Sequence, residues 1–115
     1  MLDQPLRTAI HDISEQASEV MLKGMNSFFS NSISLANEAI EEHEQLQAKE
    51  EQLKDNLNTL VDSEIQPNPR LIARLSFIVY SIRRTAEIGS EIAEVALTKA
   101  LSKQTTICKL ATSSL

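Results

Sequence analysis

Residues 73–97 read ARLSFIVYSIRRTAEIGSEIAEVAL. Apolar and small residues recur here every three or four positions, the spacing that places them on one face of an α-helix. The later part of that face consists of small residues only, which are Ala86, Gly89, Ala93, Ala96 and, just beyond the stretch, Ala100. Small residues let a neighbouring backbone come close. The stretch therefore predicts a long helix with a tightly packed neighbour, although Gly89 could also be merely tolerated at a cost of about 1 kcal/mol relative to Ala.

Two breaks divide the chain into three such helices. Residues 30–32 read SNS, and Ser and Asn favour helix caps; residues 66–69 read QPNP, and each proline disfavours helix in the residue before it. We expect the second helix to run from Ile33 to about Glu64, and the third from about Arg70 to about Ser102. Short connections force an up-down-up arrangement. The predicted fold is an all-α, antiparallel three-helix bundle over residues 1–104, with a flexible Ser/Thr-rich tail at 105–115.

Composition excludes several classes of protein. The 115 residues include 11 basic and 16 acidic ones, and the net charge of −5 disfavours binding to nucleic acids and anionic lipid surfaces. Only 3% of residues are aromatic, which disfavours base-stacking surfaces. The single cysteine, Cys108, can form neither an internal disulfide nor part of a Cys/His zinc cluster, and this suits the cytoplasm. No apolar stretch is long enough to span a membrane, so we expect no direct insertion.

Two polar residues interrupt the apolar face of the second helix. His43 and Glu50 lie seven residues apart on it, and Leu57 restores the apolar pattern. We expect His43 to bond to a carboxylate in the core, with a metal ligand or a pH switch as the alternative. A carboxylate on a buried face needs a partner, and folding the second helix back on the third brings Glu50 near Arg83 or Arg84.

Near the end of the first helix, Met21, Met25 and Phe28 widen the apolar face. They are either ordinary core residues or a surface that covers a partner, since methionine suits adaptable contacts. The sequence leaves both interpretations open.

No catalytic motif is present. The chain lacks the glycine-rich phosphate loops, the H-E-x-x-H metal motif and the G-x-S-x-G nucleophile motif. Glu87, Glu91 and Glu94 have helical spacing, but the E-x-x-H pairs of di-metal helical bundles are absent. We therefore expect no enzymatic activity, and a carboxylate-bridged metal bundle is the weakest of the functional hypotheses.

The third helix resembles that of the PhoU domain family, whose pattern there is close to L-E-R-I-G-D-x-A-x-N-I-A-E. Ile82 stands at the Leu, Arg84 at the Arg, Glu87 at the Asp and Glu91 at the Asn, and Ile92, Ala93 and Glu94 match Ile-Ala-Glu. In the second helix, residues 35–41, LANEAIE, resemble the family's L-A-x-x-V-I-E. The resemblance spans about residues 5–101.

This resemblance implies a prokaryotic, cytoplasmic regulator of phosphate uptake and phosphate signalling, which contacts a transporter or a sensor kinase and does not catalyse a reaction. The alternative is a structural or oligomerisation module that serves another transporter, such as an ion transporter.

The sequence departs from the family pattern in two ways. Many members bind iron or zinc through an acid-x-x-x-acid motif on this helix, but Arg83 replaces its first acid, and a guanidinium cannot ligate a metal. We therefore expect no metal cofactor. Typical members contain two three-helix repeats, whereas this chain contains one. We expect a homodimer that imitates the tandem repeat, covering Met21, Met25, Phe28 and the small-residue strip of the third helix; a fragment of a longer protein is the alternative.

Overall fold

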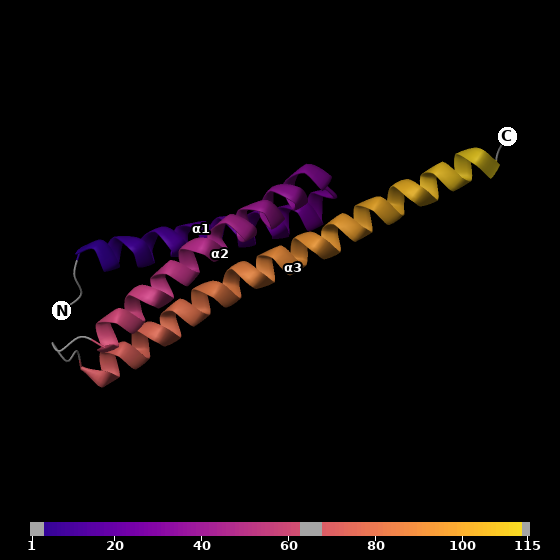
Figure 1. Ribbon diagram of the computed structural model, residues 1–115. Coiled ribbons are helices and arrows are strands. Elements are labelled where there is room, and N and C mark those ends of the chain that lie inside the picture. The colour runs from indigo at the N-terminus through magenta and orange to yellow at the C-terminus, as the bar shows by residue number, and fades with distance from the viewer. Residues whose placement is uncertain (1–3, 63–67, 114–115) are drawn as a thin grey trace.

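The computed structural model describes the backbone of residues 4–62 and 68–113, and the side chains of residues 4–59 and 68–104. Three helices lie side by side, α1 (Gln4–Ser30), α2 (Ile33–Asp62) and α3 (Pro69–Ser113), and each packs against both others (Figure 1). α2 runs opposite to α1 and α3. The predicted all-α, up-down-up bundle is confirmed.

The turn between α1 and α2 is built by its cap residues. Asn31 takes the left-handed conformation with φ 54°, and the Ser32 N–H donates to the Ser27 carbonyl at 3.1 Å, as in a Schellman motif. The Ser32 hydroxyl accepts from the Leu35 N–H at 3.1 Å and so caps α2. The predicted break at residues 30–32 is therefore confirmed.

The start of α3 is also built by a cap residue. Asn68 caps the helix, because its side-chain oxygen accepts from the Arg70 N–H at 2.9 Å and its carbonyl accepts from the Leu71 N–H at 3.0 Å. Pro69 occupies the first helical position, where a missing N–H has no consequence. Pro69 thus begins α3, close to the predicted start at Arg70. The predicted end of α2 at Glu64 lies outside the described residues.

The end of α3 differs from the prediction. The helix continues to Ser113, well past the expected end at about Ser102, and extends beyond the turn between α1 and α2 (Figure 1). No glycine or proline follows Gly89, so nothing in the sequence breaks the helix. Ser and Thr are compatible with it because their hydroxyls can bond to the preceding turn, as Thr98 does to the Glu94 carbonyl at 3.0 Å. Flexibility of residues 105–115 stays a prediction, since their side chains lie outside the described residues.

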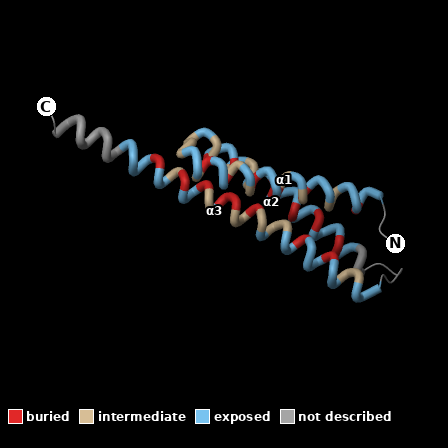
Figure 2. The backbone as a smooth tube through the Cα atoms, turned by 180° about the vertical axis from the view of Figure 1, so that it is seen from behind, coloured by how far each residue is buried: buried red, intermediate tan, exposed pale blue. Residues whose placement is uncertain are grey.

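The size of the core side chains changes along the bundle. At the end where α1 begins, it is made of large aliphatic side chains, among them Leu6, Ile13, Leu46, Leu53, Leu57, Leu75 and Val79. Around the turn between α1 and α2 it consists of small residues, namely Ala36, Ala39, Ala93 and Ala96, with Ser27 and Ser90 also buried. Figure 2 shows the buried positions gathered where the helices face one another.

α1 and α3 meet backbone to backbone at Gly24 and Gly89. A Cβ atom built on Gly24 would lie 2.2 Å from the Gly89 carbonyl oxygen, and one built on Gly89 would lie 2.7 Å from the Met21 Cα and N atoms. These are backbone atoms, which cannot rotate away. The prediction of a close neighbour along the small-residue strip is confirmed, and Gly89 is required by this contact.

Replacing either glycine should destabilise the protein. We expect Gly89→Ala and Gly24→Ala each to lower the free energy of unfolding by about 1–3 kcal/mol, because the added methyl group forces the helices apart. This loss outweighs the gain of about 1 kcal/mol in helix propensity. Urea denaturation followed by circular dichroism measures the change. Asn26→Ala, at an exposed position of α1, is the control and should be nearly neutral. A Gly89→Ala variant as stable as the wild type would contradict the contact.

Candidate functional site

A buried carboxylate lies between α2 and α3. The Glu50 side chain is 5% exposed, and its Oε2 atom lies 3.5 Å from the Arg83 Nε atom. The other oxygen, Oε1, is buried and has no hydrogen-bond partner among the described residues. The sequence left Arg83 and Arg84 open as partners of Glu50, and the structure places Arg83 there.

The Glu50 carboxyl has a raised pKa. Burial disfavours the charged form and raises the pKa above its ordinary value of 4.5; the Glu87 carboxylate adds to the rise, and the Arg83 guanidinium opposes it. The ion pair thus compensates only part of the cost of burying the charge.

Arg84 forms a second, exposed set of ion pairs along α3. Its Nη1 atom lies 2.9 Å from Glu87 Oε2 and 3.6 Å from Glu91 Oε1. The hydrogen bond to Glu87 is the largest contribution that raises the Arg84 pKa. Arg83, Arg84, Glu87 and Glu91 therefore form one polar strip, with Arg83 turned toward α2 and the others along the outside of α3.

His43 does not have the predicted partner. It is half-buried on α2, and within the described part of the chain no hydrogen bond or ion pair involves its ring. The expected carboxylate bond is therefore wrong. The neighbouring Glu42 instead accepts a hydrogen bond from Lys23 of α1, which also lies 3.6 Å from Glu38.

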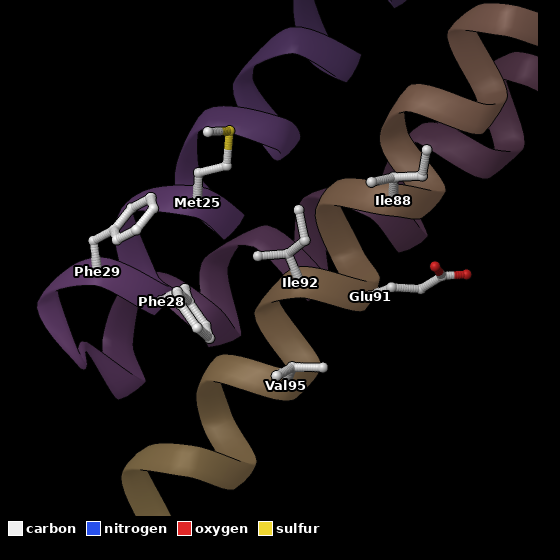
Figure 3. A pocket seen from close by; sticks show the side chains of 7 residues that line it. All are labelled: Met25, Phe28, Phe29, Ile88, Glu91, Ile92 and Val95. Carbon is white, nitrogen blue, oxygen red and sulfur yellow. The ribbon is translucent and has the colours of Figure 1, made fainter.

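An apolar groove opens between the end of α1 and the middle of α3 (Figure 3). It has a volume of about 500 Å³ and is lined by Met25, Phe28, Phe29, Ile88, Glu91, Ile92 and Val95. Glu91 is the one charged residue of this lining, and its side chain points away from the α1 residues (Figure 3). The side chain of Lys99 holds Phe28 in place, since its ammonium lies 4.3 Å from the ring centre and 3.3 Å from the Phe28 carbonyl oxygen.

The exposure of the two methionines and Phe28 is compatible with both interpretations. Met25 is 40% exposed and lines the groove, Met21 is half-buried, and the half-buried Phe28 lines the groove and also packs against the alanine cluster of the core. A role of the three residues in covering a partner stays a prediction. The structure contradicts the expectation for the small-residue strip of α3. Ala86, Ala93 and Ala96 are buried inside the chain's own bundle. The expectation that this strip covers a second copy is therefore wrong, because α1 and α2 already cover it.

Several residues of this surface were not predicted from the sequence. Phe29 is 74% exposed and Val95 56%, and both line the groove. Their apolar character was visible, but a position off the main apolar face gives no sign of a neighbouring helix that would complete a groove.

The described residues contain neither a metal-binding cluster nor a helix that could cross a membrane. No three His, Cys, Asp or Glu side chains of residues 4–59 and 68–104 are grouped so as to hold a metal ion. No described helix has the length and apolar character needed to cross a membrane.

Comparison with protein families matches the PhoU domain model to residues 10–96, which is more than half of the chain. The chain belongs to the PhoU domain family. The match runs from the first half of α1 through α2 to Ala96 of α3, and so includes the polar strip and the groove. A search of curated proteins and a search of solved structures each gave no match.

The Glu50–Arg83 pair predicts opposite effects of two substitutions in this PhoU domain. Glu50→Gln removes the buried charge and should stabilise the protein at pH 7 by an amount on the order of 1 kcal/mol. Arg83→Met leaves that charge unpaired and should destabilise it. Because the folded-state pKa of Glu50 lies above 4.5, wild-type stability from this group is greatest below that pH and falls as pH rises through the raised pKa.

Thermal and urea unfolding between pH 4 and 8 measure both effects. The difference in free energy of unfolding between Glu50→Gln and wild type should shrink as pH falls toward 4.5. The double variant Glu50→Gln/Arg83→Met should recover most of the stability that Arg83→Met loses. A Glu50→Gln variant that is less stable than wild type at pH 7 would show that the ion pair is net stabilising.

Proposed function

We propose that this PhoU domain regulates phosphate transport or its signalling through contacts with a transporter or a sensor protein, and that it does not catalyse a reaction. The family match over residues 10–96 carries the proposal. An exposed apolar groove beside a charged strip supports action by protein contact, since exposed apolar patches of this kind are typical of interaction surfaces. The proposed site of action is the cytoplasm, as the family membership implies.

We further propose that no iron or zinc cluster takes part. The family's acid-x-x-x-acid motif falls on residues 83 and 87, and its two positions are filled differently here. Arg83 is paired with Glu50, and Glu87 accepts a hydrogen bond from Arg84. A guanidinium beside the only acid of the motif repels a cation and offers it no lone pair. The donor set therefore does not fit the cluster.

We propose a homodimer as the functional unit. Phe29 and Val95 leave apolar surface uncovered at the groove. A second copy of the chain can cover such a surface.

Deleting the gene should alter phosphate uptake. We expect transport of labelled phosphate to change in phosphate-rich cells, in starved cells, or in both, and to return to normal when the wild-type gene is supplied on a plasmid. The empty plasmid is the control. Unchanged uptake under both conditions would remove the phosphate role, and recovery of a different transporter by crosslinking would identify another system.

The purified protein should contain no stoichiometric metal. After incubation with iron or zinc and removal of unbound ions, elemental analysis should give well below one metal per chain, because Arg83 stands where the family motif has its first acidic ligand. A sample treated with a chelator gives the background. About one metal per chain would overturn this part of the proposal.

A further inference from the structure

The outer face of α3, which points away from α1 and α2, has three large apolar residues in contact with solvent. Phe77 is 69% exposed, Tyr80 62% and Val95 56%. Arg84 and Glu91 lie between them on the same face, with side chains 48% and 61% exposed. A face with this much exposed apolar surface is typical of a binding surface.

The residues on this face are arranged symmetrically about the peptide bond between Glu87 and Ile88. Counted outward from these two residues, Arg84 and Glu91 are each the third, and Tyr80 and Val95 are each the seventh. Phe77 and Thr98 are each the tenth. Steps of three and four residues keep all of them on one side of a helix. The pattern matches Arg84 with Glu91 and Tyr80 with Val95, and it matches Phe77 with Thr98 and the central Glu87 with Ile88.

We propose that two copies of the chain associate through this face, with their α3 helices antiparallel and a two-fold axis at the Glu87–Ile88 bond. A two-fold axis brings each residue opposite the one equally far on the other side of it. Arg84 of each copy then faces Glu91 of the other, and Tyr80 faces Val95. The proposal rests on the homodimer proposed above and specifies its interface.

The groove lies at the edge of this face and receives part of the second copy. Val95 belongs both to the face and to the groove lining, together with Met25 and Phe29 of α1. In the antiparallel arrangement, Phe77 of the second copy lies across from residues 95–98, beside the open groove. An exposed aromatic side chain and an exposed apolar groove thus become buried together, which favours association.

Charge complementarity points to a second copy as the occupant. Arg84 and Glu91 already lie 3.6 Å apart within one chain, and their side chains are 48% and 61% exposed, so they can also reach the opposite charge of a second copy. Every contact of a two-fold interface occurs twice. A copy of the same chain therefore offers two Arg84–Glu91 pairs and two Tyr80–Val95 contacts, which a foreign apolar helix does not.

Charge reversal tests the arrangement. Arg84→Glu places a carboxylate at residue 84 opposite Glu91 of the second copy, and this like-charge contact occurs twice in the dimer. We expect it to raise the dissociation constant of the dimer by about tenfold or more, as like charges across an interface do. The double variant Arg84→Glu/Glu91→Arg restores opposite charges at both facing pairs and should restore the wild-type dissociation constant. Sedimentation equilibrium measures all three.

Lys49→Glu is the control variant, since it makes the same change in net charge at an exposed position of α2. It should leave the dissociation constant unchanged. Circular dichroism checks that each variant keeps its helices, as expected for exposed positions. Phe77→Ser, which removes the aromatic group without changing charge, should also weaken the dimer.

The outcomes separate the two proposals. A wild-type protein that is monomeric at the highest accessible concentration overturns both the homodimer and this interface. A wild-type dimer that is unaffected by Arg84→Glu and Phe77→Ser keeps the homodimer and overturns the interface. A dimer lost in Arg84→Glu and not regained in the double variant overturns the pairing of Arg84 with Glu91. None of these results changes the test of the phosphate role, which depends on uptake.

Discussion

The contact between Gly24 and Gly89 is the constraint on which the bundle depends. Two helices whose backbones touch leave no room for side chains, so the position of α1 along α3 is fixed by two residues that have none. Other contacts at this end follow from it. Phe28 comes within reach of Lys99, and Met25 and Phe29 come to lie beside Ile92 and Val95, which together form the groove. The candidate interaction surface is therefore a consequence of a packing requirement in the core.

An ion pair between α2 and the polar strip of α3 adds a second contact to this arrangement. Glu50 projects from α2 into a region of large aliphatic side chains, and Arg83 is the cation that reaches it. In the family pattern an acid stands at the position of Arg83. An acid there would face Glu50 across the interface, so the arginine and the buried glutamate suit each other physically. The same replacement removes a metal ligand, and this links the internal ion pair of this PhoU domain to the absence of a cluster that we propose.

Much of the fold could be predicted from the sequence, because helical periodicity, cap residues and prolines are local signals. The breaks at residues 30–32 and 66–69, the buried faces and the pairing of Glu50 with an arginine all followed from them. The end of α3 did not, since Ser and Thr composition suggested fraying while the absence of a breaker favoured continuation. The lack of a partner for His43 among the described residues, and the groove, could not be predicted either. Both depend on how far each helix is rotated about its own axis, and a few degrees decide whether a side chain reaches its neighbour.

The core grades from leucine to alanine along the bundle, and toward the alanine end the backbones of α1 and α3 meet at Gly24 and Gly89. The distance between two helix axes depends on the side chains at their contact. Axial slip of α1 would therefore bring large side chains against this close contact in one direction and open cavities in the other. Shear between helices is therefore a costly motion for this domain. Moving the bundle as a rigid body costs less than sliding one helix past the others.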